Sequence, residues 1–313
     1  MMNNGLSPSI IAGIITYNPD LSDLENNIQV LLGQVNHIVV VDNASENQES
    51  IRLLCMTNSE HITLISNNRN EGIACGLNQI LDMAAKQGYE WYLSMDQDSL
   101  CDPQMVDKYM PYLKDPSIGI LCPYVLNNHK IELETWRTLS GPEIEEIKEP
   151  LGCITSGSLT RTRYASQIGG YDNKLFIDGV DADFNIRMAL MHHRILRVNS
   201  TYLLQKMGKG HEISWIKRLS DRTGQSWLAR LSVSPVYSPL RLYYMSRNSE
   251  FLLWKYGKLA GKRLSRNWMR LQMLYYFLTY PRNISRREMV EAIFDGKHQA
   301  KEMICSIKHG GKE

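Results

Sequence analysis

The chain has 313 residues, 43% of them hydrophobic, which excludes a disordered chain and is enough for one large domain or two smaller ones. Residues 1–204 hold 14 Lys and Arg against 25 Asp and Glu, whereas residues 205–313 hold 21 against 8. The net charge of +2 is therefore the sum of an acidic first part and a basic second part. No apolar run reaches about 18 residues and the first residues carry no basic segment, so we expect neither a membrane-spanning helix nor a secretory signal.

Strand-like and helix-like segments alternate through the first 125 residues. Short β-branched runs predict strands, and apolar residues at helical spacing predict helices. This alternation is typical of an α/β protein whose parallel sheet is covered on both faces. The expected strands are 9–17, 37–45, 61–66, 89–95 and 117–125, and the expected helices are 21–34, 47–57, 71–88 (closed by Gly88) and 103–114.

The rhythm changes after residue 125. Residues 127–150 are polar and mixed, which predicts a loop or a β excursion. Residues 151–196 predict a strand, a short helix at about 162–168, a turn at Gly169–Gly170 and a helix from about 181 to 193. Two long amphipathic helices are expected at 240–257 and 264–280.

Polar residues follow three of the predicted strands at their carboxyl ends. They are Thr16–Tyr17–Asn18, Asp42–Asn43 and Asp96–Gln97–Asp98. In open parallel sheets, ligands bind beyond these ends, so we expect the three segments to converge on one crevice. Neither GxxxxGK[ST] nor GxGxxG follows the first strand, which argues against a P-loop nucleotide hydrolase and a Rossmann dehydrogenase.

Two of these segments suggest contacts with a nucleotide. The Asp42 carboxylate could accept a hydrogen bond from the ring N–H of uracil or thymine, with the Thr16 backbone and the Tyr17 ring beside the base; the alternative is that Asp42 caps the next helix. Gly72 and Gly76, near Asn70, would let a helix N-terminus approach a ligand. The alternative for the glycines is tight packing of the helix on the sheet.

Asp96 and Asp98 lie two positions apart and can face the same side. Carboxylates beside a diphosphate repel it unless a cation intervenes, and Mg²⁺ or Mn²⁺ readily bridges a carboxylate to phosphate oxygens. Such an ion would neutralise charge on a departing nucleotide diphosphate. The alternative is a solvated turn.

The six cysteines form no CxxC pair, so the sequence predicts no zinc site, and scattered thiols fit a reducing compartment.

A second acidic group, Asp178, Asp181 and Asp183, precedes Arg187. An Asp181 carboxylate at a helix start would be stabilised as an anion and could remove a proton from an attacking hydroxyl. The alternative is an acidic helix N-terminus with an ion pair between Asp183 and Arg187.

Taken in order, these motifs resemble family 2 glycosyltransferases, and more closely the bacterial rhamnosyltransferases that build surface polysaccharide such as O antigen. The resemblance covers about residues 9–256. It is carried by ITYNP (15–19), VVDNAS (40–45), NEGIACGLNQ (70–79), MDQDS (95–99), TSGSL (155–159), GGYDNKLFIDGVDADFNIR (169–187) and RLYYMSRN (241–248).

The resemblance implies a GT-A type fold with a mostly parallel central sheet, flanking helices and a helical C-terminal extension. It also implies inverting transfer from dTDP-L-rhamnose with Mg²⁺ or Mn²⁺. Its catalytic base falls on Asp181, and its metal ligands on Asp98 and Asp96. Its donor-binding residues fall on Thr16, Tyr17, Asp42, Asn43, Asn70, Gly72, Asp96 and Gly157. Arg187 is a further candidate site residue.

One position departs from this pattern. Related enzymes often carry a histidine three residues before a glycine, where this chain has Gln205 ahead of Gly208. His211, close by, is a candidate ligand of the metal or the diphosphate. The alternative is a loop histidine without a ligand.

The chain thus divides into a catalytic part, 1–210, and a basic, aromatic-rich helical part, 211–313. The basic part suits an anionic membrane interface and a lipid-linked oligosaccharide acceptor, although ordinary packing explains part of the pattern. We expect a cytoplasmic protein, peripheral on the inner face of the cell membrane, and no nucleic-acid partner. Alternative functions are a UDP-hexose transferase and a non-catalytic subunit that binds a nucleotide sugar or lipid.

Overall fold

The computed structural model describes residues 8–57, 59–127, 133–138, 140–206, 210–225, 228, 231–281 and 284–310. The chain folds into two compact units. Unit 1 comprises Met1–Leu126, Leu139–Phe176 and Val180–Gln205, and unit 2 comprises Asn127–Thr138, Ile177–Gly179 and Lys206–Glu313. Unit 2 therefore takes in two short segments that lie inside the predicted catalytic part of the sequence.

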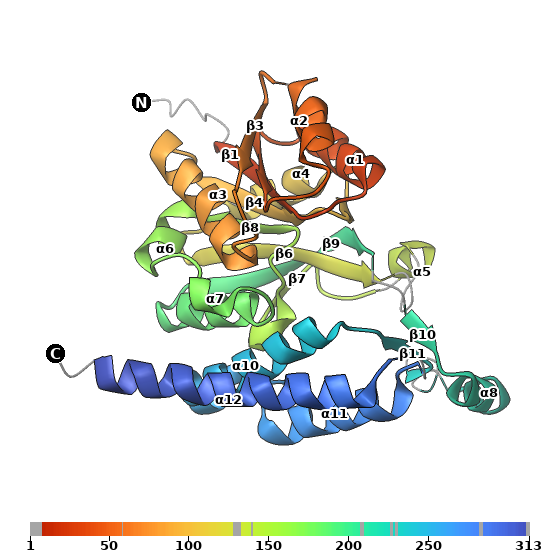
Figure 1. Ribbon diagram of the computed structural model, residues 1–313. Helices are drawn as coiled ribbons and strands as arrows, with labels where there is room; N and C mark the ends of the chain where they lie inside the picture. The colour runs from red at the N-terminus through yellow and green to blue at the C-terminus, as the bar shows by residue number, and fades with distance from the viewer. Residues whose placement is uncertain are drawn as a thin grey trace, which may run out of the picture. The chain divides into compact units, whose positions relative to one another are not determined.

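A mixed sheet forms the centre of unit 1 (Figure 1). Its strands are β1 (Ile10–Thr16), β2 (His37–Asp42), β3 (Ile62–Ser66), β4 (Trp91–Asp96), β5 (Ser99–Cys101), β6 (Ile118–Asn127), β7 (Ile144–Glu146), β8 (Ser158–Arg161) and β9 (Arg194–Gln205). They pair in the order β3-β2-β1-β4-β8-β6-β9-β5, and β7 also pairs with β9. The block β3-β2-β1-β4 is parallel, and β8 joins β4 antiparallel.

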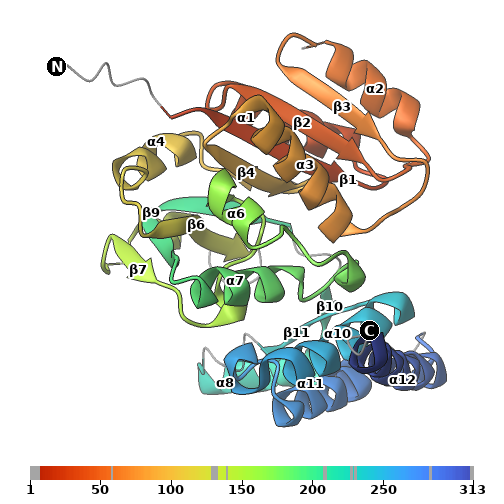
Figure 2. The ribbon, with the colours of Figure 1, turned by 90° about the vertical axis from the view of Figure 1, so that its left-hand side faces the viewer.

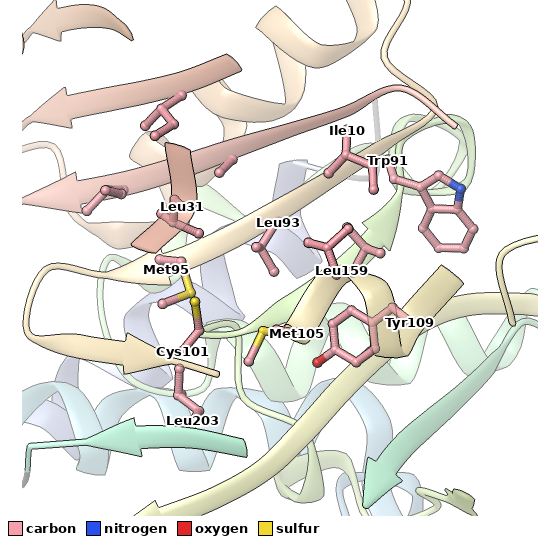
Figure 3. Packing of buried hydrophobic residues seen from close by; sticks show 14 of the residues in the cluster. Ile10, Leu31, Trp91, Leu93, Met95, Cys101, Met105, Tyr109, Leu159 and Leu203 are labelled. Carbon is pink, nitrogen blue, oxygen red and sulfur yellow. The ribbon is translucent and has the colours of Figure 1, made fainter. Parts of the chain in front are cut away.

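Helices cover both faces of the parallel block because its strands are apolar on both sides. The helices of unit 1 are α1 (Leu21–Leu32), α2 (Gln48–Met56), α3 (Ile73–Gln87), α4 (Met105–Tyr109), α6 (Thr162–Gln167) and α7 (Val180–Leu190). Ile10, Ala12 and Ile14 share a buried cluster with residues of α1, α2 and α4, part of which Figure 3 shows. The alternate strand residues face α3, where Gly13 makes room for Ile80.

The predicted α/β fold with a central sheet and flanking helices is confirmed, and element ends mostly agree within two or three residues. Gly88 closes α3 in the left-handed conformation, and its N–H donates to the carbonyls of Ala84 and Ala85. The helix expected at 103–114 is shorter, since a 3₁₀ turn at Met110–Tyr112 follows α4 where Pro111 has no N–H to donate.

Unit 2 is built mainly from helices (Figure 2). Its elements are α5 (Leu133–Arg137), β10 (Gly210–Glu212), α8 (Ser214–Thr223), β11 (Val233–Pro235), α10 (Pro239–Tyr256), α11 (Arg266–Thr279) and α12 (Arg286–Gly310). The last helix packs along α10, and a Cβ at Gly296 would lie 2.4 Å from the Tyr243 carbonyl oxygen. Within the described ranges, we find no helix with the length and apolar character needed to span a bilayer.

Candidate active site

The carboxyl ends of three parallel strands lie in register at one edge of the unit 1 sheet. Thr16 is paired with Asp42 between β1 and β2, and Ile15 is paired with Asp96 between β1 and β4. The expectation that these polar strand ends meet is therefore confirmed. In an open α/β sheet this edge is where ligands bind.

The Asp42 carboxylate holds the turn that follows β2. Its Oδ1 accepts hydrogen bonds from the hydroxyls of Thr16 and Ser45, and its Oδ2 accepts one from the Ser45 N–H at 3.1 Å. The alternative that Asp42 caps α2 is wrong, since Asn47 occupies the N-cap position. Asp42 is 0% exposed, so it fixes the strand ends, and its direct contact with a nucleotide base stays a prediction.

Asn43 connects this turn to the start of α3. Its Nδ2 donates to the Gly72 carbonyl at 3.3 Å, and its Oδ1 accepts from Asn67 Nδ2 at 2.8 Å. Asn67 in turn exchanges hydrogen bonds with the Gln79 amide, while Asn70 Oδ1 accepts from the Gly72 N–H. This amide network fixes the backbone that leads into α3.

Gly72 is needed where it stands. Its φ of +84° favours glycine, and a Cβ there would lie 2.7 Å from the carbonyl oxygen of Phe176. That same oxygen accepts a hydrogen bond from the Ile73 N–H at 2.7 Å. Gly76 packs against Ile15 of β1, so the packing explanation holds for this second glycine. Contact of Gly72 and Asn70 with a donor stays a prediction.

Tyr17 is presented at the edge by a side chain from the neighbouring strand end. The Tyr17 N–H donates to Gln97 Oε1 at 2.7 Å, and Gln97 Nε2 donates back to the Tyr17 carbonyl at 3.3 Å. The Tyr17 backbone is thus fixed while the residue is 50% exposed. Gln97 was predicted only as one of the polar residues after its strand, and its bond to the Tyr17 backbone was not predicted. The one signal for it in the sequence is an amide side chain at a strand end, where it can bind a neighbouring backbone.

Asp96 ends β4, and Gly157 lies just before β8, the strand that pairs with β4. The Asp96 N–H donates to Ser156 Oγ at 3.0 Å, and the Asp96 carbonyl accepts from Asn27 Nδ2 at 2.8 Å. The Gly157 N–H donates to the Ser94 carbonyl at 2.8 Å. The segment before β8, which contains Gly157, is therefore held beside the end of β4.

The turn from β4 to β5 carries the two predicted metal ligands. Asp96 ends β4 and Asp98 precedes β5, and both are half-buried. In the part of the chain that the structure describes, no three Asp, Glu, His or Cys side chains are grouped to hold a metal. Mg²⁺ and Mn²⁺ are commonly bound by one or two carboxylates together with substrate phosphates. Asp96 and Asp98 fit this mode of binding.

Asp181 opens α7, and its neighbours have structural partners. Asp181 is half-buried, and its Oδ1 accepts from the Ala182 N–H at 2.9 Å. Asp183 is fully buried and pairs with Arg187, whose Nε lies 2.8 Å from Asp183 Oδ2. Arg187 also donates to the Gly170 carbonyl. The predicted Asp183–Arg187 pair is confirmed, so Arg187 stabilises the fold here. A role for Arg187 in the active site stays a prediction.

His211 belongs to unit 2, where it lies in β10 opposite Ser234 of β11. Its proposed role as a ligand stays a prediction. Gly208, the other landmark of that stretch, is outside the described residues.

Comparison with known proteins identifies the family. The model of the glycosyl transferase family 2 matches residues 11–179, more than half of the chain. The chain belongs to glycosyl transferase family 2. The matched segment contains β1 to β4 and the polar strand ends described above. The alternative of a non-catalytic subunit is accordingly set aside, and the protein is a glycosyltransferase.

Similar proteins extend this assignment. The glycosyltransferase is 26% identical over 259 residues to the dTDP-rhamnosyl transferase RfbF of Shigella flexneri, covering 80% of this chain and 81% of the relative. It is 23% identical over 296 residues to the galactofuranosyltransferase GlfT1 of Mycobacterium tuberculosis, covering 89% and 91%. The predicted resemblance to rhamnosyltransferases is confirmed.

Solved structures show the same fold. The mannosyltransferase PcManGT of Pyrobaculum calidifontis, in complex with GDP-Man and Mn²⁺, aligns with a TM-score of 0.56 at 15% identity, covering 97% of this chain and 81% of its own. GalNAc-T7 with UDP, GalNAc and Mn²⁺ aligns with a TM-score of 0.55 at 12% identity, covering 87% and 55%. The predicted GT-A type fold is confirmed.

Proposed function

We propose that this glycosyltransferase transfers L-rhamnose from dTDP-L-rhamnose to a sugar hydroxyl of a lipid-linked polysaccharide precursor, with inversion at the anomeric carbon. The similarity to a dTDP-rhamnosyl transferase over four fifths of both chains supports the donor. The observation that carries the proposal is the register of Thr16, Asp42 and Asp96 at one sheet edge. That edge provides a binding surface for a nucleotide diphosphate sugar.

The donor would bind across the ends of β1, β2 and β4. The exposed ring of Tyr17 offers a face on which a pyrimidine can stack, and its backbone is fixed by Gln97. Asp42 would accept a hydrogen bond from the ring N–H of thymine. Asn43, Asn70, Gly72 and Gly157 would shape the backbone around the nucleotide and sugar. Hydrogen bonds from Asn43 to the Gly72 carbonyl and from the Gly72 N–H to Asn70 support this role.

Asp98, with Asp96, would bind a divalent cation. A bound Mg²⁺ or Mn²⁺ would offset negative charge on the diphosphate as it leaves. Two aligned structures contain Mn²⁺, which supports a divalent cation in this fold. Asp96 ends β4 and Asp98 follows two residues later, which supports cation binding by both carboxylates at this sheet edge.

Asp181 would act as the general base. Its carboxylate would take the proton from the acceptor hydroxyl as the acceptor oxygen forms a bond to the anomeric carbon of rhamnose. The bond between that carbon and the diphosphate oxygen breaks on the opposite face, and dTDP leaves with the bonding electrons. The position of Asp181 in the first turn of α7 stabilises the carboxylate as an anion. No covalent intermediate is needed.

A donor panel tests this function. We expect dTDP-L-rhamnose with Mg²⁺ to raise Tm more than equal concentrations of UDP-hexoses or GDP-mannose do, because a ligand that binds the folded state stabilises it by an amount that grows with the logarithm of its affinity. The shift should shrink without the metal. A larger shift with a UDP-hexose would instead support the alternative donor, for which the similarity to a galactofuranosyltransferase is the specific observation.

Unit 2 would place the enzyme on the inner face of the cell membrane, where a lipid-linked acceptor lies. Leu271, Leu274 and Leu278 form a ridge along α11 at helical spacing and are 62%, 53% and 69% exposed. Arg266 and Arg270 lie on the same helix. Apolar side chains beside cations are typical of a helix lying in an anionic bilayer interface. The excess of basic residues after residue 204 favours the same surface.

A vesicle experiment tests this docking. The double variant Leu271→Asp/Leu278→Asp should bind phosphatidylglycerol-containing vesicles at least about tenfold more weakly, since each buried leucine contributes about 1 to 2 kcal/mol and 1.4 kcal/mol is tenfold in affinity. Leu53→Asp, on the exposed side of α2, is the matched control and should bind as the wild type does. Equal flotation of all three proteins would contradict the assignment.

A further inference from the structure

The segment just before the proposed base has an unusual backbone. Phe176 and Asp178 have φ values of +59° and +62°, a region that residues other than glycine rarely adopt, and Gly179 follows at +82°. Such conformations persist only where the surrounding structure holds them. The chain then enters α7 at Val180, and Asp181 is the next residue.

Ile177, Asp178 and Gly179 belong to unit 2, and α10 of that unit holds them. Asn248 Nδ2 donates to the carbonyls of both Ile177 and Asp178, each at 2.7 Å. Arg241 lies seven residues before Asn248, about two turns earlier on the same face of α10. It pairs with Asp178 Oδ1 at 3.2 Å. Two residues of α10 therefore bind the backbone and the side chain of this segment.

The Asn248 amide is itself fixed in orientation. Arg247 Nε donates to Asn248 Oδ1 at 2.8 Å, so the Nδ2 group must point to the Ile177–Asp178 backbone. Asn248 is 1% exposed. At Gly179 a Cβ would lie 2.9 Å from Leu252 Cδ1, so α10 also packs closely against the end of the segment.

The Asp178 carboxylate loses contact with water where the fold holds it. Burial raises the pKa of its carboxyl group, and the Arg241 guanidinium acts in the opposite direction. Its Oδ2 is buried without a hydrogen-bond partner among the residues described. Because the Asp178 side chain is only 21% exposed and its carboxylate pairs with Arg241, the position of this segment is sensitive to Arg241.

These contacts give a structural role to the first and last residues of the motif RLYYMSRN, residues 241–248, to which the proposed function gives none. We propose that Arg241 and Asn248 are positioning residues: by fixing residues 177–179 on α10, they set where α7 begins and hence where the Asp181 carboxylate points. This inference rests on the proposed role of Asp181 as the base. Because a misplacement of about 1 Å can lower a rate on the order of 100-fold, a few hydrogen bonds outside the site can control turnover.

The full-length variant Asn248→Ala tests the inference. We expect kcat to fall by about 10- to 100-fold, with the Kd for dTDP within twofold of wild type, because Asn248 binds the backbone of residues 177 and 178 and not the strand ends where the nucleotide is expected. Amide hydrogen exchange across residues 176–182 should become faster. Ser246→Ala is the matched control: this buried serine of α10 donates to the Ile293 carbonyl of α12 instead, so its loss should leave kcat and exchange in 176–182 unchanged.

A second pair of variants covers the case in which Asn248→Ala does not fold. Arg241 is partly exposed, so Arg241→Ala should fold, with kcat lowered about tenfold, and Arg241→Lys should recover most of the loss by restoring the charge beside Asp178. Faster exchange with unchanged kcat would overturn the positioning role. Equal losses of kcat in Asn248→Ala and Ser246→Ala would overturn it as well. A wild-type protein that transfers sugar from no donor would instead contradict the proposed function, and hydrogen exchange would still test how Asn248 holds the segment.

Discussion

Replacing Asp181 with asparagine is expected to lower kcat by about 100- to 10,000-fold, the range that general base catalysis contributes. Asparagine keeps the size of the side chain and its hydrogen bond to the start of α7, but it cannot accept the proton of the acceptor hydroxyl. Donor binding should persist, because Asp181 lies in the first turn of α7 whereas the nucleotide is expected at the ends of β1, β2 and β4. Single-turnover transfer and calorimetry with dTDP measure the two effects separately.

The control for this variant is Asp82→Asn, which removes a carboxylate from the exposed side of α3. It should leave both kcat and dTDP affinity unchanged. Near-normal turnover of Asp181→Asn would show that another group takes the proton. Loss of dTDP binding together with turnover would show that the substitution acts through the fold or the donor and not through proton transfer.

Replacing Asp98 with asparagine should lower kcat/KM by about 100-fold or more in saturating Mn²⁺. Neutralising charge on a leaving diphosphate is worth several kcal/mol, and each 1.4 kcal/mol is a factor of ten in rate. Asparagine retains an oxygen but not the charge, so metal affinity should fall too. Titration with Mn²⁺, followed by its electron paramagnetic resonance signal in the presence of dTDP, measures binding without turnover.

Asp96→Asn provides a graded comparison, because Asp96 is the second carboxylate of the same turn. We expect a smaller loss from it than from Asp98→Asn. Asp107→Asn, on the exposed side of α4, is the control and should bind Mn²⁺ and dTDP as the wild type does. Unchanged Mn²⁺ binding in both Asp96 and Asp98 variants would place the metal elsewhere in the chain.

Several elements were predictable because their patterns are local. β-branched runs predict β1, β2 and β3, and Gly88 marks the end of α3, since a strand or a helix end depends on neighbouring residues. The helix α12 was not predicted, although it is the longest in the described chain. Its sequence is more polar than that of α10 or α11, so apolar residues did not mark it as a helix, and packing against α10 at Gly296 decides its place.

The candidate site divides in the same way. The strand-end positions of Asp42, Asp96 and Asp98 follow from sequence, because side chains after parallel strands meet at one edge. What each side chain does there could not be read from spacing. Asp42 proved to be a buried acceptor for Thr16 and Ser45 and not a helix cap, because the N-cap of α2 lies five residues later, at Asn47.

The sequence by itself determined the α/β class, the order of the polar strand ends and the resemblance to family 2 glycosyltransferases, since these depend on periodicity and on motifs in chain order. Only the tertiary structure decided that Gln97 holds Tyr17 and that Asn248 of α10 holds the backbone before Asp181. Each of these contacts joins groups whose hydrogen-bonding capacity is known from residue type, but the choice of partner depends on which surfaces the folded chain brings within about 3 Å.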